Sequence, residues 1–238
     1  MKIMNYEVFT NDLNTLDLSK RQVINTINPH SYVTAKNDKF FEESLQKSDL
    51  LIPDGSGIVI AAKQISKQNI EKIAGADLHK FLLEKMNKIG GKVFYMGASQ
   101  KTLDKIEEKI KQEYSNIKVC SYSPPFKAEF TKEENQEIIN KVNEFSPDVL
   151  FIGMTAPKQE KWLHTHKEKL NFTISSSIGA VFDFYAGTVE RPSDFWINIH
   201  LEWFGRLIKE PKRMWRRNFV STPLFLLDMF LFKFGIKK

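Results

Sequence analysis

Short apolar runs alternate with helix-like stretches along most of this chain, and that alternation restricts its fold more than any other feature. The runs predict strands at 23–27, 50–52, 93–96, 117–120, 149–154 and 172–175. Apolar residues at helical spacing predict helices at about 31–47, after residue 55, at 77–88, 99–112 and 131–145, and from 158. Strands joined through helices of this length form right-handed crossovers between parallel strands. The sequence therefore predicts an α/β fold over residues 1–195, with a Rossmann-like, doubly wound, mostly parallel sheet.

Side chains that cap helices mark several of these boundaries. Asp77 and Ser99 are expected as N-cap residues, because their oxygens can accept from the free amides of a first helical turn. Thr131, with Glu134 three residues later, forms a capping-box pattern. The glycine pair 90–91 is expected to end the helix that Asp77 begins.

The composition fits one domain with an appendage. The chain has 238 residues, of which 42% are hydrophobic, and this is enough for a substantial core. Its single cysteine, Cys120, cannot form an internal disulfide, so nothing in the sequence requires an oxidising compartment. The first residues interrupt their apolar run with Asn, Glu, Thr and Asp, unlike a signal peptide. We therefore expect a cytoplasmic protein.

Residues 196–238 are expected to form a helical appendage that associates with a membrane. Residues 201–238 hold nine Lys or Arg and three acids, a balance of +6 that equals the net charge of the whole chain. An apolar stretch, 219–236, follows the cations directly. Such a segment suits a membrane surface, where Lys and Arg meet anionic headgroups.

The tail has three conceivable arrangements. A transmembrane helix needs about 20 mostly apolar residues, whereas Pro223, Asp228 and Lys233 interrupt the tail with groups that are costly in a bilayer. A segment lying in the membrane interface suits the aromatic residues and flanking cations. The alternative is a helix packed on the domain, with Asp228 and Lys233 at its rim.

Ligands of doubly wound sheets bind beyond the carboxyl ends of the strands, and polar residues or glycines gather there. They are Thr26 and Asn28, Asp54 and Gly55, Gly97 to Ser99, Thr155 to Glu160, and Ser177 to Asp183. Asp54 is the strongest catalytic candidate, since an acid beside a glycine can act as a general base on a closely approaching ligand. A helix N-cap is the alternative role for Asp54.

The other strand ends suggest binding roles. Gly97, Ala98 and Ser99 would present free amides at a helix N-terminus, where a diphosphate can bind. Gln159 offers a hydrogen-bond donor and an acceptor to a sugar. The alternative is that these residues simply form the first turn of a helix, where the helix dipole favours an acid such as Glu160. Asp183 is a candidate for ligand binding or for accepting from backbone amides.

The sequence lacks the usual signatures of cofactor sites. Neither the glycine-rich dinucleotide fingerprint nor the P-loop pattern occurs. The five histidines show no metal-ligand spacing beyond His164 and His166, which point to different faces of a helix. We expect no metal and no cofactor.

Four arginines of the appendage could bind an anionic ligand: Arg206, Arg213, Arg216 and Arg217. Arginine binds diphosphate oxygens bidentately and keeps its charge, so such a pair would stabilise a diphosphate leaving group. The alternatives are a solvated basic face or contacts with lipid headgroups alone. Nucleic acid is not expected as a partner, because such patches do not usually run into a tail of Leu and Phe.

Taken together, these motifs resemble the WecG/TagA/CpsF family of glycosyltransferases, known as family twenty-six. The resemblance covers about residues 26–217. It rests on TINP, PDG, AGADL, VFYMGAS, SPDVLFIGMTAPKQEKW, GAVFDFYAGTVERP and LEWFGRLIKEPKRMWRR, in that order. Each motif is weak alone, but their number and order are specific.

The resemblance implies metal-independent, inverting transfer of a sugar, often of N-acetylmannosamine type. The donor would be a UDP-sugar and the acceptor a polyprenyl-diphosphate-linked saccharide, in the synthesis of teichoic acid or another cell-surface polysaccharide. It implies Asp54 as the general base. The implied substrate-binding residues are Thr26, Asn28, Gly55, Lys72, Gly97, Gln159, Asp183, Arg206, Arg213 and Arg216. The enzyme would be cytoplasmic and peripheral on the inner face of the cell membrane, and a homo-oligomer is compatible with the sequence.

Two departures from the family pattern and two rival functions stay open. Lys72 stands where the family usually has an arginine before AGADL, so bidentate binding is lost there. The segment between Val8 and Gln22 is too short for the family's usual early helix. The rivals are a Rossmann-type nucleotide-sugar oxidoreductase or epimerase, and a non-enzymatic membrane adaptor.

Overall fold

Six parallel strands form the central sheet. A computed structural model of the chain describes residues 1–189, 204, 207–208 and 211–236. The sheet order is β4-β3-β8-β7-β5-β6, with all five neighbouring pairs parallel. The strands are β3 (Gln22–Ile27), β4 (Leu50–Pro53), β5 (Lys92–Gly97), β6 (Lys118–Tyr122), β7 (Val149–Gly153) and β8 (Ile174–Ser177). Because every strand runs the same way, all their carboxyl ends meet at one edge, as predicted.

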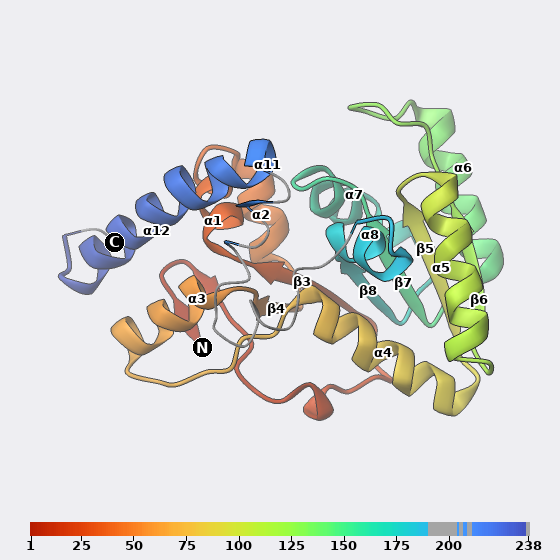
Figure 1. Ribbon diagram of the computed structural model, residues 1–238, viewed down its shortest axis with the longest axis horizontal. Coiled ribbons are helices and arrows are strands. Elements are labelled where there is room, and N and C mark those ends of the chain that lie inside the picture. The colour runs from red at the N-terminus through yellow and green to blue at the C-terminus, as the bar shows by residue number, and fades with distance from the viewer. Residues whose placement is uncertain (190–203, 205–206, 209–210, 237–238) are drawn as a thin grey trace.

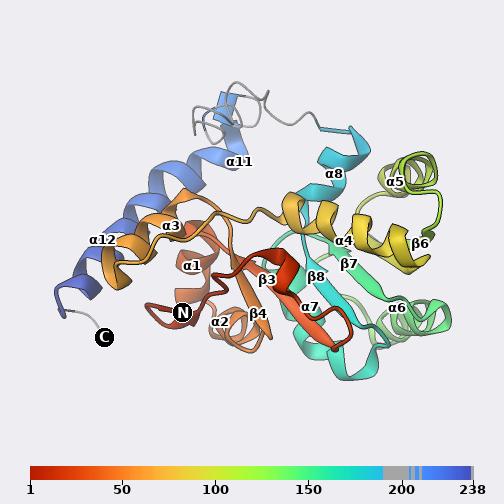
Figure 2. The ribbon, with the colours of Figure 1, turned by 90° about the horizontal axis from the view of Figure 1, so that it is seen from below.

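Helices cover both faces of this sheet (Figures 1 and 2). One face carries α1 (Pro29–Lys36), α2 (Lys39–Gln46), α6 (Lys132–Phe145) and α7 (Lys158–His166). The other carries α4 (Gly75–Ile89), α5 (Gln100–Glu113) and α8 (Ala180–Ala186). The predicted doubly wound α/β class is confirmed.

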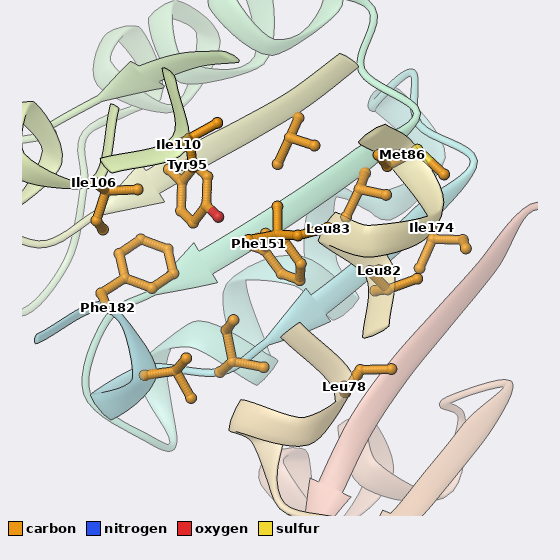
Figure 3. Close-up of a cluster of buried hydrophobic side chains, with 14 of the residues drawn as sticks. Leu78, Leu82, Leu83, Met86, Tyr95, Ile106, Ile110, Phe151, Ile174 and Phe182 are labelled. Atoms are coloured by element: carbon orange, nitrogen blue, oxygen red, sulfur yellow. The ribbon is translucent and has the colours of Figure 1, made fainter. Parts of the chain in front are cut away.

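The largest apolar core lies between the sheet and α4, α5 and α8 (Figure 3). Leu78 and Leu82, one helical turn apart on α4, are fully buried together with Leu83. They face strand residues such as Phe151, and Phe182 of α8 closes the cluster against Tyr95 at a ring-centroid distance of 5.1 Å. Burial of both faces explains why the strands read as continuous apolar runs.

Two of the three predicted N-terminal caps are confirmed. Ser99 Oγ accepts from Thr102 N at 3.2 Å, and Thr131 forms a capping box with Glu134. The prediction for Asp77 is wrong, because α4 begins two residues earlier. Asp77 is the third residue of α4, and its carboxylate accepts from Ala74 N at 2.8 Å.

The helix predicted at 31–47 is two helices, α1 and α2. Asp38 accepts from Phe41 N at 3.0 Å and caps α2, so the chain turns between the helices. The turn allows Tyr32 of α1 and Leu45 of α2 to reach the same apolar cluster. Capping by a local aspartate therefore outweighs continued helical periodicity.

The chain before β3 adds a two-stranded antiparallel sheet that was not predicted. It pairs β1 (Lys2–Ile3) with β2 (Tyr6–Glu7), and a 3-10 turn, η1 (Leu13–Thr15), follows. Phe9 N donates to Leu51 O at 2.9 Å, so this segment lies beside the outer strand β4. Each strand is only two residues long, which is too short to show an alternating apolar pattern in the sequence.

The described part of the C-terminal appendage is helical. It comprises α11 (Pro211–Arg216), the π-helical turn η4 (Arg217–Ser221) and α12 (Thr222–Lys233). The helix α12 packs on α1, on α3 (Ser56–Ala61) and on the π-helical turn η2 (Ala62–Ser66). The predicted boundary at 195/196 lies outside the described residues.

One face of α12 is buried, so the packed arrangement of the tail is the one observed. Phe225 is fully buried, and Asp228 is only 6% exposed rather than at a rim. Its carboxylate forms an ion pair with Lys36 and accepts from Tyr32 Oη at 3.3 Å, which offsets the cost of burial. The other face exposes Leu224, Leu227 and Phe230, and Phe234 and Ile236 are exposed just beyond the end of the helix. No helix in the described part of the chain is both long and apolar enough to cross a bilayer.

Candidate active site

The neighbouring ends of β3 and β4 bring Asn28 and Asp54 together. The strands stay in register to their last residues, where Ile27 pairs with Pro53. Asp54 N then donates to Ile27 O at 2.9 Å, and Asn28 Nδ2 donates to Asp54 Oδ2 at 3.5 Å. Thr26 and Asn28 are half-buried. Three of the predicted residues, Thr26, Asn28 and Asp54, therefore lie together at the ends of these two neighbouring strands.

The orientation of the Asn28 carboxamide follows from the helix that it caps. Asn28 Oδ1 accepts from His30 N and from Ser31 N, both at 3.0 Å. Backbone amides only donate, so the oxygen must face α1 and the NH2 group must face Asp54. The cap thus fixes an N–H donor toward the Asp54 carboxylate.

Asp54 is not the N-cap of the helix that follows it. The helix α3 begins at Ser56, and Gly55 is its N-cap residue. Gly55 has φ +93°, a conformation that favours glycine. Apart from its chain neighbours, no atom of the described residues lies within 4 Å of a Cβ built there, so the space at Gly55 is open. The structure therefore does not support the N-cap role for Asp54.

Lys72 lies beside the same strand end. Ile73 N donates to Pro53 O at 3.0 Å and holds the segment before α4 against the end of β4. Lys72 itself is exposed. The structure therefore places the backbone of Lys72 near Pro53, the last residue of β4, which precedes Asp54.

Gln159, at the start of α7, joins the ends of β7 and β8. Its Oε1 accepts from Met154 N at 3.1 Å, and its Nε2 donates to Glu160 Oε1 at 2.9 Å. A Cβ on Gly179 would lie 3.0 Å from Gln159 Oε1, so glycine there permits this close approach. Gln159 is only 5% exposed, and its side chain orders the loops after both strands.

Glu160 is a buried acid, whereas the sequence predicted only an acid favoured by the dipole of the first helical turn. It is 5% exposed, and its Oε2 has no hydrogen-bond partner among the described residues. Burial raises the pKa of Glu160 to about 7, while the bond from Gln159 and the charge of Arg217 act in the opposite direction. Its spacing of three residues from buried Leu163 places it on the apolar face of α7, which the sequence could have revealed.

The turn after β5 differs from the predicted anion site. Gly97 has φ +112°, and a Cβ there would lie 2.5 Å from Gly153 O. Ala98 N donates to Gly153 O at 2.8 Å, so this amide is not free to bind an anion. Gly97 is therefore needed for close approach of β5 and β7, and the expectation of free amides fails at Ala98.

Asp183 lies on α8, after β8, and is half-buried. Its Oδ1 accepts from Thr188 Oγ1 at 3.2 Å. The amides of Thr188 and Val189 donate to the backbone carbonyl of Asp183 instead of its carboxylate. Asp183 therefore lies in the first turn of α8, and its carboxylate accepts a bond from the turn that follows the helix.

The appendage brings arginines to the end of β3. Arg213 and Arg216 lie on α11, whereas Arg206 lies outside the described residues. Burial, together with the smaller effects of the charges of Arg217 and Arg216, lowers the pKa of His30 to about 4. His30 Nδ1 is 2.9 Å from Ser221 Oγ, so η4 directly contacts the helix that Asn28 caps.

These positions form two groups along the carboxyl edge of the sheet. Asp54 and its neighbours lie at the β3–β4 end, with the arginines of α11 and η4 beside α1. Gln159, Asp183 and Gly97 lie at the ends of β7, β8 and β5. Among the residues that the structure describes, no group of three or more His, Cys, Asp or Glu could hold a metal.

Comparison with known proteins gives a consistent result. Residues 2–238 match the model of the glycosyl transferase WecG/TagA/CpsF family. A Bacillus spizizenii protein is 31% identical over 211 residues, covering 89% of this chain and 79% of the relative. A Bacillus subtilis protein is 32% identical, covering 87% and 78%, and a Staphylococcus aureus protein is 26% identical, covering 90% and 81%. All three are named N-acetylglucosaminyldiphosphoundecaprenol N-acetyl-beta-D-mannosaminyltransferase.

Proposed function

The chain belongs to the WecG/TagA/CpsF family of glycosyltransferases, and we propose that it transfers an N-acetylmannosamine-type sugar from a UDP-sugar. The acceptor would be a polyprenyl-diphosphate-linked saccharide used in teichoic acid or other cell-surface polysaccharide synthesis. The names of the Bacillus relatives support this donor sugar and this class of acceptor. Membership of a transferase family leaves no support for the oxidoreductase, epimerase and adaptor alternatives.

Asp54 is proposed as the general base, and its position is the observation that carries the proposal. Its carboxylate would take the proton from the acceptor hydroxyl while that oxygen attacks the anomeric carbon of the donor sugar. The bond from the anomeric carbon to UDP would break on the opposite face, which inverts the configuration. Open space at Gly55 and the N–H of Asn28 beside the carboxylate support this role.

The cations of the site are proposed to bind the UDP diphosphate. Arg213 and Arg216, with Arg206, would neutralise the charge that develops as UDP leaves. Their support is the effect of Arg216 and Arg217 on His30, which places the positive field beside α1. Lys72 would add a single point charge to this group.

The remaining predicted residues are proposed to shape the sugar pocket. Thr26 and Gly97 lie at the carboxyl ends of β3 and β5, where sheets of this class bind ligands, and Asp183 lies on α8, the helix that follows β8. Gln159 would act through the loops that it orders, since its carboxamide is engaged by Met154 and Glu160.

The exposed face of α12 is proposed to attach the enzyme to the inner face of the cytoplasmic membrane. Leu224, Leu227, Phe230, Phe234 and Ile236 would enter the interface, and we call these five residues the apolar face. Attachment there would hold the enzyme where a lipid-linked acceptor is found.

Substitution of Asp54 by Asn tests the proposed chemistry. We expect transfer to fall by about 10²-fold or more, because the amide cannot accept the hydroxyl proton. Transfer would be measured with a panel of UDP-sugars and a lipid-linked acceptor, and UDP binding by calorimetry should stay unchanged. The exposed Asp104→Asn is the matched control and should behave as wild type. Full turnover by Asp54→Asn would refute the assignment.

A further inference from the structure

Phe225 of α12 lies where α1 and α3 meet. Its ring is fully buried and packs edge-on against Tyr32 of α1, with centroids 5.2 Å apart and planes at 85°. On the other side, a Cβ built on Gly57 of α3 would lie 3.6 Å from Phe225 Cε1. The same Cβ would lie 2.4 Å from Pro29 Cγ, so α1 and α3 touch directly beside the ring.

The two helices in contact with Phe225 begin at the candidate catalytic pair. Asn28 is the N-cap of α1, and α3 begins two residues after Asp54. Any change in the distance between the two helix starts therefore changes the distance between Asn28 Nδ2 and Asp54 Oδ2. At 3.5 Å this contact is at the long limit for a hydrogen bond, so a small displacement removes it.

Polar contacts hold α12 and η4 in this position. Asp228, one turn after Phe225, pairs with Lys36 at the far end of α1, and Lys233 Nζ donates to Gln64 Oε1 at 2.7 Å beyond α3. Ser221 contacts His30 near the start of α1. The appendage is therefore fastened to both helices, with the aromatic ring between them.

We propose that Phe225 is a positioning residue that sets the spacing of α1 and α3 and thereby the geometry of Asn28 and Asp54. The inference rests on the proposed role of Asp54 as the base. It gives the buried face of α12 a function separate from membrane attachment, which belongs to the apolar face. The ring acts through packing and touches neither substrate.

Kinetics with a short-chain, water-soluble acceptor and no membrane test this role. Phe225→Ala should lower kcat about tenfold or more, because the base loses its alignment, while KM for the UDP-sugar changes less than twofold. Phe225→Leu should recover most of kcat. Phe219→Ala removes an exposed ring of the same appendage and should match wild type. An unchanged kcat in Phe225→Ala would overturn the inference.

Amide hydrogen exchange gives a readout that does not depend on activity. Phe225→Ala should accelerate exchange at His30 and Ser31, whose amides Asn28 holds, and at Asp54, whose amide Ile27 holds. The amide of Thr102, capped by Ser99, is the distant reference and should not change. Native protection at all three amides of Phe225→Ala would also contradict the inference.

Two outcomes separate this inference from the proposed function and from simple unfolding. If the wild type transfers no sugar, the proposed function fails, whereas the exchange experiment still tests the positioning. If Thr102 also exchanges faster in Phe225→Ala, the variant has unfolded, and Phe225→Leu then carries the test. A Leu variant with faster exchange at Asp54 but full kcat would show that the spacing does not govern catalysis.

Discussion

At the residue scale, Asn28 shows how one side chain serves both a helix and a neighbouring carboxylate. Its oxygen is used by the first turn of α1 and its nitrogen faces Asp54. Aspartate caps helices as well as asparagine does, but it has no N–H to donate. Replacing one by the other therefore separates the two roles.

We predict that Asn28→Asp keeps stability and loses activity. The cap is retained, but a second negative charge beside Asp54 raises the pKa of that carboxyl group. The acid limb of the kcat/KM profile should move to higher pH, by about one unit. Urea unfolding should change little, whereas Asn28→Ala should lose about 1 kcal/mol with the cap. An unshifted acid limb would contradict the assigned orientation of the amide.

Glu160 should make the stability of the protein depend on pH. Its folded pKa of about 7 lies above the ordinary value of 4.5, so the unfolded chain loses this proton first as pH rises. The contribution of Glu160 to the free energy of unfolding is therefore fully present below about pH 4.5 and is lost as pH rises through about 7. Over this interval, the free energy of unfolding of the wild type should fall by up to about 3 kcal/mol relative to that of Glu160→Gln.

Urea denaturation at pH 5 and pH 8 measures this difference. Glu129→Gln, at an exposed position, is the control and should follow the wild type at both values. If the unfolding free energies of wild type and Glu160→Gln stay parallel, the buried carboxyl does not carry the raised pKa.

At the element scale, the junction of β5 and β7 depends on Gly97. We predict that Gly97→Ala lowers the free energy of unfolding by about 2–4 kcal/mol, because the methyl would meet Gly153 O at 2.5 Å in a left-handed conformation. Urea titration followed by circular dichroism is the measurement. Gly75→Ala is the matched control, since a Cβ there finds only ordinary contacts of 3.4 Å or more. Equal losses in both variants would contradict the packing argument.

Most elements could be predicted because their signals are local. Each of the six central strands lies within about two residues of its predicted range, since buried parallel strands are apolar throughout. Errors arose where two local signals compete, as at Asp38, where a cap interrupts a helical pattern. The prediction for Asp77 is wrong because a carboxylate can accept from the free amides of a helix start either at the N-cap position or at the third helical residue.

The sequence predicts which strand ends gather at the site, but it does not predict which side chains contact one another there. The topology of a parallel sheet brings Asn28 and Asp54 to one edge. The orientation of Asn28, the burial of Glu160 and the approach of Gly97 to Gly153 depend on neighbours that are distant in sequence. Hydropathy patterns carry no information about such pairs.

At the scale of the whole molecule, α12 has a buried face and an exposed face, for which we propose separate roles. We predict that Leu227→Glu with Phe230→Glu greatly reduces recovery with vesicles containing anionic lipid, because two charges would enter the interface. Co-sedimentation is the measurement, and activity on a water-soluble acceptor should persist. Ile89→Glu with Phe126→Glu changes exposed apolar residues elsewhere and is the control. Undiminished recovery of the first variant would refute attachment through the apolar face.

The cluster around Phe225 also determines when the enzyme is complete during its synthesis. It is built from residues within the first seventy of the chain together with α12 near its end. A ribosome makes the chain from its N-terminus, so Tyr32 and Ile58 leave the exit tunnel long before Phe225 does. The apolar surface around α1 and α3 must therefore wait uncovered while the rest of the sheet is translated. Nascent chains from which α12 has not yet emerged would thus expose this surface to chaperones.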